Sequence, residues 1–372
     1  MPDLVAIDMA GGPAFVAALT QAWEEGDAVL PVDQRLPEAA RAGLLDVMAP
    51  AIVVDGDGRH RRRGGQPVDA GDALVMATSG TTGLPKGVVL THDAVEASAR
   101  ATSARLGVDP ARHRWLACLP LNHVGGMSVV TRALITGTAL TVLPGYDAVA
   151  VGGCAGADVM VSLVATALRR TPADLFGKVV LGGSVPPADL PDNVVTTYGL
   201  TETGSGVVYD GLPLDGVEVE IDGSGEIRLR GPMLLRSYRD GTVPLETGGW
   251  LRTGDAGSIG AEGRLVVQGR IGDLIITGGE NVWPVPVEDA IRAHPAVADV
   301  AVAGRPDPEW GQRVVAWIVV ASGARPPALD EIRDLVGSAL PRFAAPRQLV
   351  LTDALPRTAI GKISRSELAI DG

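Results

Sequence analysis

The chain has 372 residues, which is longer than one hydrophobic core usually supports, so we expect two domains. Hydrophobic residues make up 46% and charged residues 20%, which is typical of packed globular proteins. The net charge of −12 excludes a broad basic surface for nucleic acid. An anionic substrate must therefore be held by a few placed cations.

The two cysteines exclude a disulfide framework and a cysteine-based zinc cluster. The first residues show no basic segment followed by an apolar stretch, and no apolar run reaches membrane-spanning length. We therefore expect a cytoplasmic protein with no membrane span.

Helical and β-type patterns alternate through the N-terminal part of the chain. Helices are expected at 13–24, 37–48, 92–106 and 126–136, and strands at 28–32, 51–54, 73–78, 114–119, 139–143 and 179–181. Such alternation predicts mostly parallel sheets covered by helices on both faces. The one basic run, 59–63, is interpreted as a solvated loop, with an anion-binding patch as the weaker alternative.

A smaller β-rich part is expected at about 211–268, where 217–221 and 226–230 alternate with period two around a turn and predict a hairpin. We place a domain boundary within 269–273. This gives an N-terminal α/β domain, 1–271, and a small α+β domain, 272–372. In the second domain we expect helices at 286–294 and 328–340, strands at 297–303 and 313–320, and a polar tail.

The most informative segment is 78–87, Thr-Ser-Gly-Thr-Thr-Gly-Leu-Pro-Lys-Gly, which follows an apolar strand and precedes a helical segment. Its glycines let backbone N–H groups turn toward an anion, its hydroxyls add donors, and Lys86 adds a positive charge. The segment departs from the Walker A pattern, because no Gly precedes the Lys. We interpret it as a phosphate-binding loop rather than an ordinary polar turn.

This loop resembles the signature of the adenylate-forming superfamily, which includes acyl-CoA synthetases, luciferases and peptide-synthetase adenylation domains. Further segments resemble the family's motifs in the family's order: 198–203, 225–232 with Tyr238, 250–255, 269–270, 278–281 and 357–362. The resemblance covers nearly the whole chain. It implies that a carboxylate attacks the α-phosphate of ATP to form an acyl-adenylate, and that the acyl group then passes to coenzyme A.

The resemblance also implies roles for individual residues in binding ATP and Mg²⁺. Glu202 corresponds to the Mg²⁺ ligand, Tyr198 to the residue against adenine, Asp255 to the ribose binder and Arg270 to a second residue that supports the ribose. Without the motifs, Glu202 would be a solvated glutamate and Asp255 a turn residue. The implied ATP-binding residues are Thr78, Ser79, Gly80, Thr81, Thr82, Lys86, Gly182, Gly183, Ser184, Tyr198, Gly199, Asp255 and Arg270.

Lys362 corresponds to the cation that stabilises charge in the adenylation transition state, and Thr201 to a hydroxyl near the phosphate. The family runs its second half-reaction after the small domain rotates, which would bring Gly278, Gly279, Glu280 and Asn281 toward CoA. The chain departs from the family at the hinge. Gly272 stands where relatives have Asp or Lys, and the neighbouring Asp273 is a candidate substitute.

The acyl site is expected around His123, which corresponds to a catalytic residue bordering the acyl pocket; a buried structural histidine is the alternative. Gly125, Ser128 and Arg132 share one helical face, and a buried guanidinium needs an anionic partner from the protein or the substrate. A His followed by such an Arg, together with the stretch 208–217, resembles the o-succinylbenzoate–CoA ligases of menaquinone biosynthesis. Further candidate pocket residues are Ser162, Leu163, Val164, Ser205, Gly206 and Val208.

Other functions stay open at this point. The enzyme alternative is a CoA ligase for another aryl or medium-chain acid, and the alternative of another class is a non-catalytic nucleotide-binding relative. Only 77 residues precede the phosphate loop, far fewer than in most of the superfamily. This predicts either a more open acyl pocket or one that a second copy of the chain completes, as in a homodimer.

Overall fold

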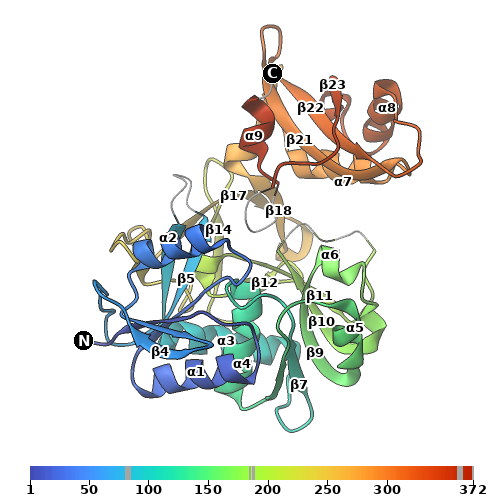
Figure 1. Cartoon of the computed structure of the whole chain (residues 1–372). Helices are drawn as coiled ribbons and strands as arrows, with labels where there is room; N and C mark the ends of the chain where they lie inside the picture. Colours follow the sequence, from blue (N-terminus) through green and yellow to red (C-terminus); the bar gives the residue numbers. More distant parts are fainter. Residues whose placement is uncertain (80–84, 184–185, 187–188, 358–362, 371–372) are drawn as a thin grey trace. The chain divides into compact units, whose positions relative to one another are not determined.

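The computed structural model describes the chain apart from residues 80–84, 184–185, 187–188, 358–362 and 371–372 (Figure 1). The chain divides into two compact units. The first consists of Met1–Glu220, Arg228–Thr253 and Gly260–Leu265, and the second of Ile221–Ile227, Gly254–Ile259 and Val266–Gly372. The domain limits 1–271 and 272–372 stay a prediction.

The first unit contains a seven-stranded sheet with the order β16-β6-β5-β2-β1-β3-β4. The four central strands are parallel, and most of their side chains are buried, as in sheets covered on both faces. The strands are β1 (Leu4–Ile7), β2 (Ala28–Pro31), β3 (Ile52–Asp55), β4 (Gly58–Arg61), β5 (Asp72–Ser79), β6 (Pro85–Thr91) and β16 (Ser237–Tyr238), with α1 (Pro13–Glu24) and α2 (Glu38–Met48) between them.

A second seven-stranded sheet has the order β13-β12-β11-β10-β9-β7-β8, with five parallel strands and an antiparallel edge. Its strands are β7 (Arg114–Ala117), β8 (Ala139–Val142), β9 (Gly156–Val164), β10 (Phe176–Gly182), β11 (Val194–Gly199), β12 (Gly206–Tyr209) and β13 (Leu212–Pro213). The helices of this region are α3 (His92–Leu106), α4 (Val124–Thr136), α5 (Ala148–Gly153) and α6 (Ala165–Leu168). The predicted mostly parallel α/β architecture is confirmed.

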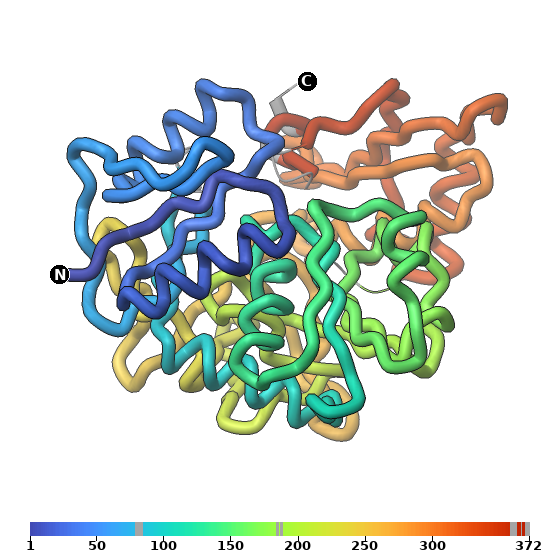
Figure 2. The backbone as a smooth tube through the Cα atoms, turned by 60° about the horizontal axis from the view of Figure 1, so that its bottom comes forward, coloured from blue at the N-terminus to red at the C-terminus, as the bar shows by residue number. Residues whose placement is uncertain are grey.

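The loops that follow β1 and β8 lie against each other, although they come from different sheets (Figure 2). A Cβ atom at Gly11 would lie 2.7 Å from the carbonyl oxygen of Leu143. Only glycine therefore allows this approach without a backbone shift. The contact brings together the carboxyl ends of strands from both sheets, where open α/β sheets commonly bind ligands.

One strand of this unit was not expected from the sequence. Between the phosphate loop and α3, β6 pairs antiparallel with β5. Val88, Val89 and Leu90 are consecutive and all buried, so β6 lacks the alternation that marks a half-exposed strand.

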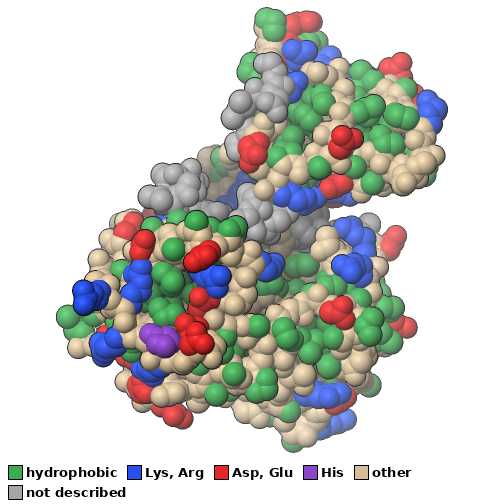
Figure 3. Space-filling view, viewed as in Figure 1, with side chains coloured by type: hydrophobic (Ala, Val, Ile, Leu, Met, Phe, Trp, Pro, Cys, Tyr) green, Lys and Arg blue, Asp and Glu red, His purple; other side chains and the backbone are tan. Residues whose placement is uncertain are grey.

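The basic run 59–63 is not a loop, because most of it forms β4, an exposed edge strand paired with β3. Its arginines pair with acids of the first unit: Arg59 with Glu25 at 2.5 Å and Arg61 with Asp3 at 3.0 Å. Figure 3 likewise shows acidic and basic side chains interspersed on the visible face.

The second unit contains a sheet with the order β20-β19-β22-β21, with β23 also on β22. Its elements are β19 (Ile275–Thr277), β20 (Glu280–Val282), α7 (Pro284–Arg292), β21 (Val297–Asp307), β22 (Gly311–Val320), α8 (Leu329–Ala339), β23 (Gln348–Leu351) and α9 (Arg365–Ile370). Val300 and Val302 face a core with α7 and α8, whereas Ala301 and Ala303 face one with α9. The expected polar tail therefore contains a strand and a short helix.

A four-stranded sheet, β14-β15-β17-β18, accounts for the predicted β-rich part and its hairpin. Its strands are β14 (Glu218–Ile221), β15 (Glu226–Arg230), β17 (Leu251–Ile259) and β18 (Leu265–Arg270). Single-turn 3₁₀ helices are η1 (Ala173–Leu175), η2 (Thr201–Thr203), η3 (Ala261–Gly263), η4 (Ile271–Asp273) and η5 (Arg342–Ala344). Within the described residues, no helix is both long and apolar enough to span a membrane.

Candidate active site

The predicted phosphate loop begins at the end of β5 and ends at the start of β6. Thr78 lies opposite Lys86 in the ladder, and its hydroxyl donates to the Lys86 carbonyl oxygen at 3.4 Å. Ser79 is the last residue of β5, whereas Gly80, Thr81 and Thr82 lie outside the described residues. The two strands thus fix where both ends of the loop leave the sheet.

Lys86 and Glu202 are both in contact with Tyr238, which lies on β16. The ammonium of Lys86 lies 5.0 Å from the centroid of the Tyr238 ring, a cation–π distance. The Tyr238 hydroxyl donates to Oε1 of Glu202 at 3.0 Å. Burial and the Glu202 carboxylate raise the pKa of Tyr238, so the phenol stays a donor. The sequence pointed to Tyr238 as a motif residue but not to this contact.

The turn that carries Thr201 and Glu202 is held by the next residue, Thr203. The Thr203 hydroxyl accepts from the backbone N–H of Leu200 at 2.9 Å and lies 2.7 Å from the Ser205 carbonyl oxygen. Thr203 is completely buried. The orientation of Glu202 therefore depends on a fixed 3₁₀ turn, which is what a metal ligand requires.

Further residues predicted to bind ATP lie at neighbouring strand ends. Gly182 ends β10, and Tyr198 and Gly199 end β11, which pairs parallel with β10. A Cβ atom at Gly199 would lie 2.2 Å from the Ser205 carbonyl oxygen, so this position requires glycine. Gly183 follows with φ +87°, and Ser184 lies outside the described residues.

The predicted ribose pair belongs to the second unit. Nε of Arg270 lies 2.9 Å from Oδ1 of Asp255, which is 6% exposed. The two residues predicted to bind the ribose are therefore in direct contact, and their role toward the ribose stays a prediction.

The predicted CoA segment forms the turn of a β-hairpin between β19 and β20. Gly278 and Gly279 have φ of +60° and +84°, as a two-residue hairpin turn requires. The Gly278 N–H donates to the Trp310 carbonyl oxygen at 2.8 Å, and an added Cβ would lie 2.9 Å from the Trp310 ring. Glu280 and Asn281 are exposed on the strand that follows. No sequence motif pointed to Trp310.

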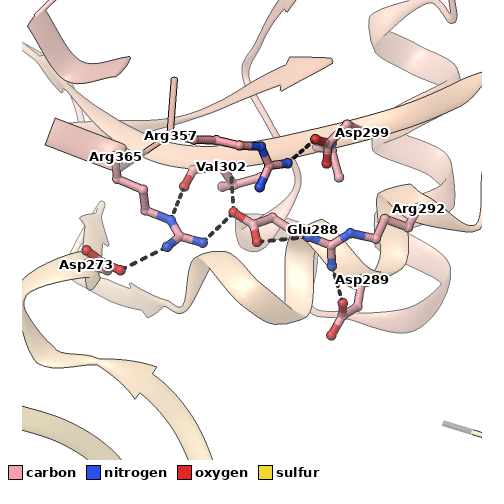
Figure 4. Close-up of polar contacts among 9 residues, drawn as sticks. Asp273, Glu288, Asp289, Arg292, Asp299, Val302, Arg357 and Arg365 are labelled. Atoms are coloured by element: carbon pink, nitrogen blue, oxygen red, sulfur yellow. Dashed lines mark hydrogen bonds and ion pairs between the residues drawn. The ribbon is translucent and has the colours of Figure 1, made fainter. Parts of the chain in front are cut away.

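The predicted hinge residues, Gly272 and Asp273, lie in η4. Figure 4 shows the guanidinium of Arg365 between Asp273, Glu288 and the Val302 carbonyl group. Its nitrogens lie 3.1 Å from Asp273 Oδ2, 2.6 Å from Glu288 Oε1 and 3.1 Å from the Val302 oxygen. Glu288 is buried and also accepts from the Val302 N–H at 2.8 Å.

The predicted catalytic Lys362 lies outside the described residues, but both flanks of its segment are described. Arg357, before it, pairs with Asp299, and Arg365, after it, joins the cluster around Glu288 (Figure 4). The second unit thus fixes the points from which this segment leaves and returns.

The acyl-site candidates lie on and around α4, whose N-cap is His123. Gly126 lies against the preceding loop. A Cβ atom at this position would lie 2.4 Å from the Pro120 carbonyl oxygen, so the close contact requires glycine. Ser128, Ser162 and Ser205 are buried, and the Ser205 hydroxyl lies 2.8 Å from that of Ser98 on α3. Gly125 and Gly206 are partly buried.

Arg132 is one of the largest fully buried side chains, with 2% of its surface exposed. Its guanidinium stacks on Trp115 at 4.7 Å from the ring centroid. Its Nε and Nη1 atoms are buried and, within the described part of the chain, lack a hydrogen-bond partner. Burial lowers the pKa of Arg132, and the nearby Tyr209 opposes this. The sequence predicted the need for an anion but neither aromatic neighbour.

A cavity of about 430 Å³ lies within the first unit at the carboxyl ends of β1, β2, β7, β8 and β9. Phe15, Leu121 and Val164 supply apolar walls, while Arg35 and Arg170 supply positive charge. Arg132 does not line it. Residues 9–11 and 32–35 line this cavity, so the short N-terminal part of the chain contributes directly to its wall.

Two family models match the chain in order. The AMP-binding enzyme model matches residues 60–239, and the model of the AMP-binding enzyme C-terminal domain matches residues 286–362. Both segments contain motifs that the sequence analysis identified.

Individual relatives extend these matches. A probable 2-succinylbenzoate–CoA ligase of Mycobacterium tuberculosis is 40% identical over 332 residues, covering 82% of this chain and 86% of the relative. The o-succinylbenzoate CoA synthetase of Bacillus subtilis with its acyl-adenylate intermediate has a TM-score of 0.87 at 28% identity, covering all of this chain and 88% of the other. The same synthetase with ATP and magnesium ion has a TM-score of 0.85 at 28% identity, covering 98% and 89%. The chain therefore belongs to the AMP-binding enzymes.

Proposed function

We propose that the chain is an ATP-dependent o-succinylbenzoate–CoA ligase of menaquinone biosynthesis that works through an acyl-adenylate. The relatives named above support the reaction. The observation in this chain that carries the choice of acid is Arg132, a buried guanidinium whose Nε and Nη1 have no hydrogen-bond partner among the described residues. A dicarboxylate offers one carboxyl group for activation and a second as the anion that such a group needs.

In the first half-reaction the substrate carboxylate attacks the α-phosphate of ATP, the bond between the α-phosphorus and the oxygen that bridges to the β-phosphate breaks, and pyrophosphate leaves as the acyl-adenylate forms. Lys86 and the 78–87 loop would hold the phosphates, and Asp255 with Arg270 would bind the ribose. Lys362 would stabilise the charge that develops between carboxylate and phosphate. Catalysis then consists chiefly of positioning and electrostatic stabilisation.

Glu202 is the proposed protein ligand of Mg²⁺. A carboxylate oxygen together with substrate phosphates suits this ion, and the Tyr238 hydroxyl and the Thr203 turn hold the carboxylate in place, so the donor set fits. Charge on the phosphates is neutralised by Mg²⁺ when the ion is bound.

In the second half-reaction the thiol of CoA attacks the acyl carbonyl carbon, and AMP leaves as the thioester forms. Gly278, Gly279, Glu280 and Asn281 are the residues we propose to face CoA. Their hairpin turn is fixed against Trp310, so it would present a defined surface.

A panel of acids tests the choice of substrate. Pyrophosphate release should be fastest with o-succinylbenzoate, and thioester should form only when CoA is added. Arg132→Met should raise KM chiefly for dicarboxylates, whereas Arg100→Met, which removes an exposed arginine of α3, should not. Faster turnover of benzoate or of an alkanoate would select the alternative acid, and no turnover with any acid would select the non-catalytic alternative.

We also propose a cytoplasmic location, and we keep the homodimer as an open part of the proposal. A monomer and a homodimer are the two cases to compare. Mass measurement at the concentrations of the activity assay distinguishes the two cases.

A further inference from the structure

Asp33, in the loop after β2, is a buried carboxylate that gathers several donors. It accepts from the Arg35 backbone N–H at 3.0 Å, from Nε and Nη2 of Arg35 at 2.8 Å each, and from Nδ2 of Asn122 at 3.1 Å. Only 8% of its surface is exposed. Burial alone would raise the pKa of Asp33, but the hydrogen bonds and charge of Arg35 outweigh this effect, so the pKa of Asp33 is lowered. The carboxylate therefore stays charged and fixes both donors.

The same two donors point to one atom of His123. Nη2 of Arg35 lies 3.2 Å from Nε2 of His123, and Nδ2 of Asn122 lies 3.5 Å from it. A guanidinium can only donate, and the Asn122 amide must direct its NH₂ group to Asp33, which can only accept. Nε2 of His123 therefore has to accept.

An imidazole that accepts at Nε2 is neutral and carries its proton on Nδ1. The position of His123 agrees, because it caps the N-terminus of α4, where the helix dipole disfavours an added positive charge. Arg35 adds a second cation on the same side. The histidine is thus held as a neutral, oriented ring rather than as a cation for a substrate carboxylate.

Arg35, Asp33 and Asn122 also line the cavity of about 430 Å³ in the first unit. His123 directly follows the lining segment 119–122 and begins α4, the helix that carries Arg132. A substitution in the 33–35 loop can therefore alter the acyl site by changing the orientation of His123.

We propose that Asp33 and Arg35 are positioning residues that hold His123 as the neutral Nδ1–H tautomer and thereby set the affinity for the acid. The N-terminal segment then takes a direct part in substrate selection. The effect on the acid rests on the proposed function, whereas the tautomer does not.

NMR of ¹⁵N-histidine-labelled protein without substrate tests the tautomer, with His123→Gln used for assignment. We expect a pyridine-like Nε2 and a pyrrole-like Nδ1 resonance for His123. Arg35→Met should shift both resonances, and Arg35→Lys, which keeps a donor, should restore them in part. Arg61→Met is the matched control, since it removes an exposed arginine paired with an aspartate elsewhere in the same sheet. A protonated Nε2 in the wild type, or unchanged resonances in Arg35→Met, would overturn the proposal.

Kinetics tests the consequence for the acid. Arg35→Met should raise KM for the acid about tenfold, as expected for loss of a charge-assisted hydrogen bond, with KM for ATP unchanged. Arg35→Lys should recover part of this loss, and Arg61→Met should show none. Equal changes in both KM values, or a loss of kcat alone, would contradict the role in acid binding. If no acid is activated at all, the proposed function fails, and the NMR result still decides the tautomer.

Discussion

Replacing Arg132 with methionine should make the ligand-free protein more stable. Nε and Nη1 are buried without hydrogen-bond partners in the described chain. Each unsatisfied buried donor costs about 1–3 kcal/mol. The stacking on Trp115 returns only about 0.5–2 kcal/mol. Methionine has a similar length and needs no partner, so we expect a gain of about 1–4 kcal/mol, the range seen when buried charges are replaced by apolar side chains.

Urea unfolding of the ligand-free proteins, followed by circular dichroism, measures this gain. The same variant should raise KM for o-succinylbenzoate at least about tenfold, since a charge-assisted contact is lost, and should leave monocarboxylates nearly unchanged. Stability and dicarboxylate binding would then change in opposite directions, as is common at functional sites. A destabilised variant with equal losses on both classes of acid would show instead that Arg132 is a structural residue.

Three further results are expected. Lys362→Ala should lower pyrophosphate release by about 10²–10³ while ATP still binds in a nucleotide titration, and unchanged release would refute its role. Tyr238→Phe removes a hydrogen bond to Glu202 and should raise the Mg²⁺ concentration for half-maximal activity about fivefold, so an identical Mg²⁺ titration would contradict the contact. Burial raises the pKa of Cys118 to about 12, so at pH 8 its thiol stays protonated. A thiol reagent should modify the less buried Cys154 alone, and a labelled Cys118 peptide from folded protein would exclude this.

The sequence identified the helices that border the acyl site, although residues 126–133 of α4 are buried on all sides. The limits of α3 are clear in the sequence, because Thr91 caps its first turn and Gly107 follows its last residue in the left-handed conformation. Hydrophobic periodicity did not predict the strands β6 and β4, because β6 is buried on both faces and β4 is exposed on both. Only tertiary pairing with β5 and β3 gives these two segments their structure.

Much of the site could be predicted because its motifs are continuous in sequence. The contacts that hold these motifs join residues that lie far apart in the sequence. Asp33 and Asn122 are 89 residues apart, and Glu202 and Tyr238 are 36 apart. Each contact joins residues of ordinary type whose meaning depends on the fold. Sequence therefore named candidates such as His123 and Glu202 but not the contacts that orient them.

The predicted hinge residue Asp273 is in contact with Arg365. Asp273 was expected to compensate for Gly272 by favouring one orientation of the small domain. Its described partner, Arg365, belongs to the same unit and is itself held by the buried Glu288. A contact that moves with the unit has the same energy in both orientations and cannot favour either. The Arg365 pair therefore gives Asp273 a role in fixing η4 to α9 within this unit.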